Sequence, residues 1–233
     1  MAYESLGKST LCSKIIEHLQ DKVDSTVIFY FCRHDNVTRS PALDILRTLA
    51  TQLLAANNDF APYIIENYIN AGKRPSRKIL LDIIGTMIGS IESVRVILDG
   101  VDEWPEVDLI EAIEDLLSLN GPQQGQCKVL VSSRRVRSLS KTLGSKSILR
   151  LEDHAEHLNS TISSFVNVRL HSLRKKFDTG LVDELQRTIL SKANLMFLWV
   201  KLVMSTLEDL YYESDLRDAI DNIPEDMEGL YAC

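Results

Sequence analysis

Four residues near the amino end have the types that bind nucleotide phosphates. They are Gly7, Lys8, Ser9 and Thr10, at the start of a predicted helix. A phosphate-binding loop needs inward-pointing main-chain N–H groups, a lysine that neutralises phosphate charge and a hydroxyl that holds Mg²⁺. The full motif also has a glycine at position 2, where this chain has Ala2. A GKST stretch alone is weak evidence and is more often an ordinary helix start, so other residues must decide between the two interpretations.

A second group of candidate residues follows the apolar run at residues 94–99, VRVILD. A buried strand that ends in a carboxylate presents this acid to Mg²⁺ at the carboxyl edge of a sheet. We therefore expect Asp99 to hold Mg²⁺ through water, and Asp102 or Glu103 to orient or deprotonate the attacking water. An acidic turn before a helix is the alternative explanation. The presence of Lys8 earlier in the chain favours the nucleotide site.

A third candidate, Arg134, follows the apolar run at residues 127–132. A cation at the tip of the strand next to the acidic strand could sense the γ-phosphate, and Ser132 or Ser133 is a weaker candidate for this role. The alternative is a solvated basic loop, since further arginines follow Arg134.

The order of predicted elements places all these residues in an α/β domain. Strands are predicted over residues 26–32, 94–99 and 127–132, with a short fourth strand over residues 147–151. Helices are predicted over residues 8–22, 41–54, 63–71, 79–91 and 107–119. The run at residues 26–32 is continuously apolar, which is typical of a strand buried on both faces. Strands separated by helices form βαβ units, so we expect a mainly parallel sheet with flanking helices.

After residue 152 the pattern becomes entirely helical. Helices are predicted over residues 156–173, 181–192, 196–210 and 214–220. We therefore expect a nucleotide-binding domain at residues 1–152 and a small helical domain at residues 153–233, in which Trp199 belongs to the core.

Composition narrows the class of protein further. The chain has 233 residues, 45% hydrophobic and 25% charged, which fits a globular protein with one main domain. The net charge of −7 argues against broad binding to nucleic acid, which needs a basic face. The four cysteines and five histidines lack metal-site spacing, so we expect reduced thiols and a cytoplasmic protein. There is no signal sequence, and the longest apolar stretch, residues 195–204, is too short to span a membrane.

Six segments, in their order and spacing, resemble one known family. They are GKSTLCSKIIEHL, VIFYFCRHDNVTRSPALDILRTLATQLL, VRVILDGVDEW, KVLVSSR, ANLMFLWVKLVMSTLED and LRDAIDNIPEDMEGLYA. The chain is similar over nearly its whole length to fungal NACHT proteins with a nephrocystin-3-like N-terminal domain. These include the vegetative-incompatibility proteins and other STAND proteins that carry repeats.

The resemblance implies a P-loop NTPase core and a small helical domain that together act as an NLR-like signalling switch. Such proteins hold Mg²⁺ with ATP/ADP or GTP/GDP, and nucleotide exchange or slow hydrolysis changes their oligomeric state. Implied partners are the nucleotide, further copies or full-length NACHT proteins, and neither nucleic acid nor a membrane. By position, the Walker A end is Gly7, Lys8, Ser9 and Thr10, the Walker B acid is Asp99, the catalytic-side acids are Asp102 and Glu103, and the sensor arginine is Arg134.

The chain departs from this family at several positions. Ala2 and Ser5 stand where the loop has glycines, and Leu195 stands where a glycine often precedes the MFLW segment. The strand that feeds the loop is absent from the sequence, so we expect a phosphate loop cut short at its amino end. A second hypothesis is therefore an interaction fragment that associates without nucleotide. A small-molecule kinase is a third, less favoured option, since no Arg-rich lid is found outside residues 134–137.

Overall fold

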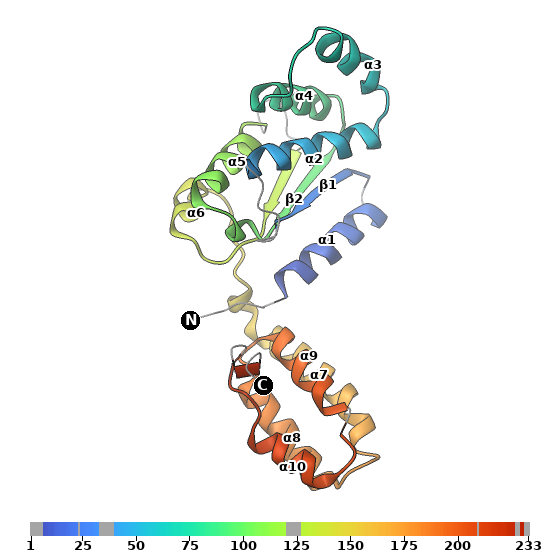
Figure 1. The fold of residues 1–233 in the computed structure, drawn as a ribbon, viewed down its shortest axis with the longest axis vertical. Helices are drawn as coiled ribbons and strands as arrows, with labels where there is room; N and C mark the ends of the chain where they lie inside the picture. The colour runs from blue at the N-terminus through green and yellow to red at the C-terminus, as the bar shows by residue number, and fades with distance from the viewer. Residues whose placement is uncertain are drawn as a thin grey trace. The chain divides into compact units, whose positions relative to one another are not determined.

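The computed structural model describes residues 7–22, 24–32, 40–119, 127–208, 210–226 and 229–230. The chain divides into an α/β unit that runs from Lys8 to Lys146 and a helical unit that follows from Ser147 (Figure 1). The division falls a few residues before the boundary expected at residue 152. The predicted fold class, a parallel sheet with flanking helices followed by an all-helical part, is confirmed.

Three parallel strands form the sheet in the order β1 (Thr26–Phe31), β2 (Val94–Asp99) and β3 (Cys127–Val131). All three lie within the predicted ranges. In β2 every residue except Arg95 is buried, because β2 is the central strand. The expectation that the first strand is buried on both faces is wrong. Only Ile28 of β1 is fully buried, because β1 lies at an edge of the described sheet.

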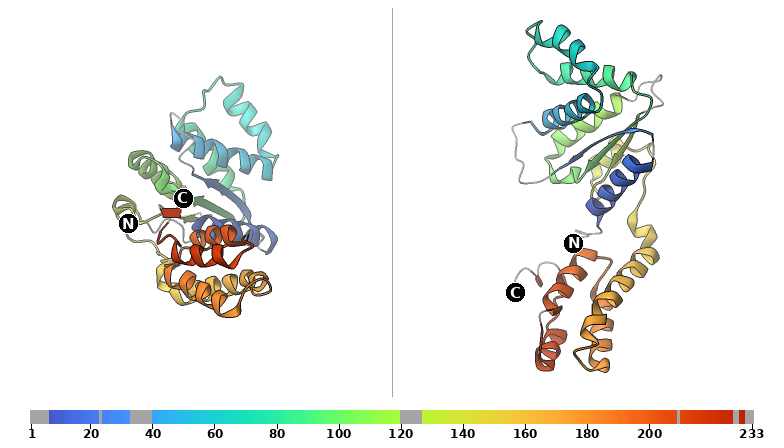
Figure 2. Two further views of the ribbon diagram at one scale, coloured as in Figure 1. Left: turned by 60° about the horizontal axis from the view of Figure 1, so that its bottom comes forward. Right: turned by 90° about the vertical axis from the view of Figure 1, so that its right-hand side faces the viewer.

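Helices cover both faces of the sheet. One face is covered by α1 (Lys8–Lys22). The other carries α2 (Pro41–Ala56), α4 (Arg77–Gly89) and α5 (Glu106–Ser118), which enclose the larger core. The right-hand view of Figure 2 shows α1 on the opposite side of the strands from α2 and α5.

A narrow face of α1 packs against the sheet. The buried residues are Cys12 and Ile16, which pack with Ile97 of β2. Leu11, which precedes Cys12, is 40% exposed. The small thiol of Cys12 lets the first turns of the helix approach the end of β2 closely.

Some connecting segments differ from the sequence prediction. The expected helix at residues 63–71 is α3 (Phe60–Ile64) followed by a π-helical turn, η1 (Ile65–Ile69). A short helix, α6 (Arg137–Thr142), was not predicted. A fourth strand at residues 147–151 is wrong, because residues 147–150 have no regular structure and a 3₁₀ turn, η3 (Leu151–His154), follows. Exposed Ile148 and Leu149 have no neighbouring strand to pair with among the described residues.

The helical unit consists of α7 (Ala155–Leu173), α8 (Thr179–Lys192), α9 (Phe197–Glu208) and α10 (Glu213–Asp221). Its core surrounds Trp199, which is fully buried as predicted. The turn before α9 is strained, since Leu195 has a φ of 62°, a left-handed conformation that favours glycine. None of the described helices combines the length and the apolar character that a membrane crossing requires.

Candidate functional site

The carboxyl ends of the three strands lie side by side and are joined by main-chain hydrogen bonds. The N–H of Cys32, just after β1, donates to the carbonyl of Asp99 at 2.8 Å. The N–H of Ser132, just after β3, donates to Leu98 at 2.8 Å, and that of Gly100 donates to Ser132 at 3.0 Å. Side chains from three distant parts of the sequence therefore meet at one edge of the sheet.

Asp99 is the buried acid at this edge. It is only 3% exposed, and its Oδ1 atom has no hydrogen-bond partner among the described residues. The Oγ atom of Ser132 is buried and likewise has no hydrogen-bond partner there. Buried carboxylate oxygens normally accept hydrogen bonds or bind a cation. The two oxygens therefore fit a hydrated divalent cation.

The first turns of α1 lie next to this acid. The Cys12 thiol lies against the Asp99 carboxylate and the Ser132 hydroxyl. Burial raises the pKa of Cys12 to about 11, and the charge of Asp99 contributes to the increase, so the thiol stays protonated at neutral pH. Lys8 and Ser9 lie one helical turn before Cys12 and thus on the neighbouring part of the same surface. Lys8 is half-buried.

Gly7 precedes α1 in a left-handed conformation, with a φ of 71°. Among the described residues other than its chain neighbours, no atom lies within 4 Å of the position that a Cβ would occupy, so the backbone angle is what favours glycine here. Ser9 and Thr10 follow on the exposed side of the first turn. Ala2 and Ser5, which replace expected glycines, lie outside the described residues.

Asp102 and Arg134 form an ion pair. Arg134 donates its main-chain N–H to Oδ1 of Asp102 at 2.8 Å and its Nε–H to Oδ2 at 2.7 Å. The Asp102 side chain is 7% exposed, whereas that of Arg134 is 47% exposed. The structure thus brings these two predicted residues together, and both carboxylate oxygens of Asp102 accept hydrogen bonds from Arg134.

Glu103 lies on the exposed side of the same turn. Its Oε1 atom is 3.4 Å from the place where a Cβ on Gly100 would lie, and the carbonyl of Cys32 is 3.1 Å from that place. Gly100 also has a φ of 70°, so a glycine is favoured both by the backbone angle and by these close neighbours.

Burial raises the pKa of Cys32 to about 12, with smaller contributions from the charges of Asp99, Glu103 and Asp102. The charges of all three predicted acids therefore act on one buried thiol.

Cys12 and Cys32 were not predicted as parts of the site. Helical spacing from Lys8 could have identified Cys12, and the end of the first strand could have identified Cys32. Within the described residues, no three His, Cys, Asp or Glu side chains are grouped as a metal site.

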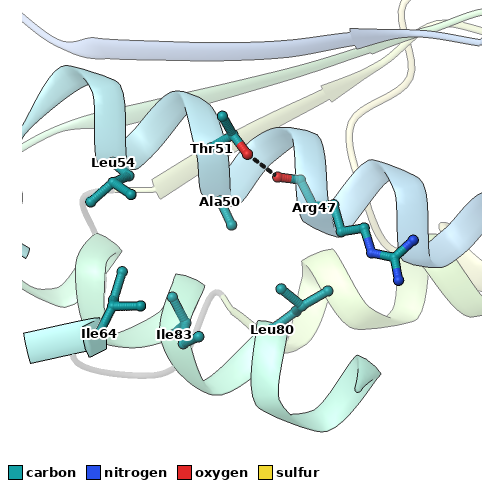
Figure 3. A pocket seen from close by; sticks show the side chains of 7 residues that line it. All are labelled: Arg47, Ala50, Thr51, Leu54, Ile64, Leu80 and Ile83. Atoms are coloured by element: carbon teal, nitrogen blue, oxygen red, sulfur yellow. Dashed lines mark hydrogen bonds between the residues drawn. The ribbon is translucent and has the colours of Figure 1, made fainter. Parts of the chain in front are cut away.

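Two cavities open elsewhere, both beside α4. The first, about 190 Å³, lies between α2, α3 and α4 (Figure 3) and is lined mainly by apolar side chains. The second, about 610 Å³, contains Tyr68, Lys73 and Asp82. None of the predicted phosphate or magnesium residues lines either cavity.

The sequence profile of one family covers much of the α/β unit. The family is described as Nephrocystin 3, N-terminal, and its profile matches residues 3–134. The chain belongs to the nephrocystin 3 N-terminal family. The matched residues contain every candidate of the site, from Gly7 to Arg134.

A curated relative extends the similarity of this nephrocystin 3 N-terminal family member to the helical unit. The vegetative incompatibility protein HET-E-1 of Podospora anserina is 27% identical over 240 residues, which cover 97% of this chain. The chain spans only 18% of the length of HET-E-1. The predicted resemblance to fungal NACHT proteins is thereby confirmed.

Proposed function

We propose that this chain is the nucleotide-binding module of a cytoplasmic STAND/NACHT signalling NTPase. It binds Mg-ATP or Mg-GTP and hydrolyses it slowly, as a conformational switch. The observation that supports this proposal best is the buried Oδ1 of Asp99, which lacks a hydrogen-bond partner among the described residues and lies beside the first turns of α1. A P-loop NTPase needs an acid and a helix amino end in this arrangement.

Each predicted residue has a role in this proposal. The amino end of α1 supplies main-chain N–H groups to the phosphates, and Lys8 adds a positive charge. Ser9 and Asp99 hold Mg²⁺, which when bound neutralises charge on the β- and γ-phosphates. Thr10 is the alternative hydroxyl. Arg134 contacts the terminal phosphate, and an acid of the Asp102–Glu103 pair orients the attacking water.

Binding of a fluorescent ATP analogue to the Lys8→Ala variant tests the site. We expect the substitution to weaken binding at least tenfold, on the order of the loss of a charge-assisted hydrogen bond. Lys14→Ala is the matched control, because Lys14 lies on the same helix but pairs with Glu17 in solvent. Equal affinity of the wild type and Lys8→Ala would show that the site is wrong.

The second candidate function is a nucleotide-incompetent interaction fragment that associates with itself or with full-length NACHT proteins. Two features favour it. β3 has a free edge among the described strands, and Leu130 on it is 41% exposed. Residues 127–146 contain six Lys or Arg and no Asp or Glu, which gives this segment a basic character within an acidic chain.

Thermal unfolding distinguishes the two functions. A ligand that binds only the folded state raises the melting temperature. We therefore expect millimolar Mg-ATP or Mg-GTP to raise it if the chain is a nucleotide module. The fragment hypothesis instead predicts no shift with either nucleotide and a salt-sensitive association in sedimentation.

A further inference from the structure

We infer that the second cavity, beside η1 and α4, binds a phosphorylated polyol such as an inositol phosphate. The cavity has a volume of about 610 Å³. The residues that line it are Tyr68, Lys73, Ser76, Lys78, Ile79 and Asp82. None of them belongs to the proposed nucleotide site, so this binding is a separate property of the α/β unit.

Two lysines give the cavity its positive charge. Neither Lys73 nor Lys78 has a carboxylate partner among the described residues. Lys78 and Asp82 are four residues apart on α4, a spacing that permits an ion pair, yet Asp82 accepts the hydroxyl of Tyr68 instead. Two cations without counter-charges at one cavity, in a chain with a net charge of −7, indicate an anionic ligand.

The lysine that follows η1 is held in place by its neighbours. The Lys73 N–H donates to the carbonyl of Tyr68 at 2.9 Å, and its ammonium lies 4.8 Å from the centre of the Tyr68 ring. The ring is only 6% exposed, and its hydroxyl donates to Oδ2 of Asp82 at 2.5 Å. This wall of the cavity is therefore ordered before a ligand arrives, which lowers the entropic cost of binding.

The amino end of α4 adds neutral donors to the two cations. The Ser76 hydroxyl accepts the N–H of Ile79 at 3.4 Å, and its own O–H can still donate. The N–H groups of Arg77 and Lys78 come too early in α4 to have an acceptor within the helix. Hydroxyl and main-chain N–H groups beside a lysine are suitable donors to phosphate oxygens.

Asp82 narrows the class of ligand. Its carboxylate repels a bare phosphate, but it has further lone pairs that accept hydrogen bonds from ligand hydroxyl groups. A nucleotide base would need an open aromatic face for stacking. The Tyr68 ring that lines the cavity is buried, and Lys73 lies over it. The cavity therefore fits a phosphate carried by a hydroxylated skeleton without a base.

Isothermal titration calorimetry with inositol 1-phosphate tests the site. We expect Lys73→Ala/Lys78→Ala to bind it about tenfold more weakly than the wild type, because two charge-assisted contacts are lost. Lys73→Arg/Lys78→Arg should retain binding. The matched control is Lys175→Ala/Lys201→Ala, which removes the same charge from exposed positions of the helical unit and should bind normally. Equal affinity of the wild type and Lys73→Ala/Lys78→Ala would overturn the inference, and melting curves verify that each variant is folded.

Inorganic phosphate tests the class of ligand. The wild type should bind inositol 1-phosphate more tightly than inorganic phosphate, and Asp82→Asn should reduce this preference about fivefold, since it weakens an acceptor of hydroxyl groups. Equal affinity of the wild type for the two compounds would show that the polyol is not recognised.

Vesicles with and without phosphatidylinositol distinguish a lipid headgroup from a soluble ligand. Binding to phosphatidylinositol vesicles that free inositol 1-phosphate displaces would identify the headgroup as the source. Binding of the free compound alone would identify a soluble ligand. Vesicle binding that the free compound does not displace would contradict the cavity as the site. Lys8→Ala should bind inositol 1-phosphate as the wild type does, so failure of the nucleotide site and failure of this inference are separate results.

Discussion

The guanidinium of Arg77 on α4 holds the buried carboxylate of Asp115 on α5 with two parallel hydrogen bonds. Nε donates to Oδ2 at 2.6 Å and Nη2 donates to Oδ1 at 2.7 Å. Arg77 also contacts the carboxylate of Glu111, one turn earlier on α5. Asp115 is one of two charged residues recorded in the buried part of the described chain, the other being Asp99. The pair joins two helices that cover the same face of the sheet.

Replacing Arg77 by alanine should destabilise the α/β unit. The Asp115 carboxylate would be left buried without its partner, which costs about 2 kcal/mol after allowance for the 40% exposure of Arg77. Urea unfolding measures this loss. Arg74→Ala is the control, because Arg74 is exposed in the loop before α4, and it should change stability by less than about 0.5 kcal/mol. Equal stability of the two variants would contradict the prediction.

The Asp99→Asn substitution should increase the stability of the ligand-free protein and weaken its binding of Mg-ATP. In the described part of the wild-type chain, one buried carboxylate oxygen of Asp99 has no hydrogen-bond partner, so removal of the charge should stabilise the ligand-free protein by about 1 kcal/mol. The same change removes the acid that we propose for Mg²⁺. Mg-ATP should therefore raise the melting temperature of the wild type much more than that of the variant.

Melting curves with and without Mg-ATP measure both effects of the Asp99 substitution. Asp115→Asn serves as a control, because Asp115 is a buried acid that already has a partner in Arg77. This variant should lose stability and keep the full response to Mg-ATP. A less stable Asp99→Asn protein with an unchanged ligand response would exclude the proposed role of Asp99.

Leu195→Gly should be more stable than Leu195→Ala. Both substitutions remove the same half-buried leucine side chain, but only glycine relieves the φ of 62°. The difference in free energy of unfolding should be about 1 kcal/mol in favour of glycine. Denaturant titration of the two variants isolates this backbone contribution. Equal stabilities would mean that the turn before α9 does not hold residue 195 in the left-handed region.

The buried Cys32 thiol predicts a loss of stability at alkaline pH. Its pKa is raised from the ordinary 9.0 to about 12, so above about pH 9 the unfolded chain releases a proton that the folded chain retains. The stabilisation is therefore complete below about pH 9 and is lost as pH rises toward 12. Cys32→Ala should be less stable than the wild type near pH 7 by about 1 kcal/mol, and this gap should shrink by about pH 11. A gap that stays constant with pH would contradict the raised pKa.

The sequence predicted the strands better than the contacts at their ends. All three strands are apolar runs bounded by polar turns, and this local pattern determined their ranges. The stretch at residues 147–151 is also rich in apolar residues, yet it is not a strand, because strand formation also needs a neighbouring strand to pair with. The burial of β1 was overestimated for a related reason. Whether a strand lies at the edge or in the centre of a sheet depends on its neighbours and cannot be read from its own residues.

The candidate site was predictable as a set of residues but not as an arrangement. Residue type and order identified Lys8, Asp99 and Arg134. The pairing of Arg134 with Asp102 depends on how the turn after β2 meets the loop after β3, and these segments are far apart in the sequence. The thiols of Cys12 and Cys32 were missed because cysteine has no required role in phosphate binding.

The parallel register of the sheet has a consequence for how the site arises during folding. Phe31 lies opposite Asp99, and Leu98 lies opposite Val131, so the three strand ends coincide only when all the crossover connections are closed. Such non-local pairing is slow to form. A one-residue slip of β2 would turn the Asp99 side chain to the opposite face. Competence for a ligand should therefore appear late in refolding, together with the complete sheet, and not with any partly ordered intermediate.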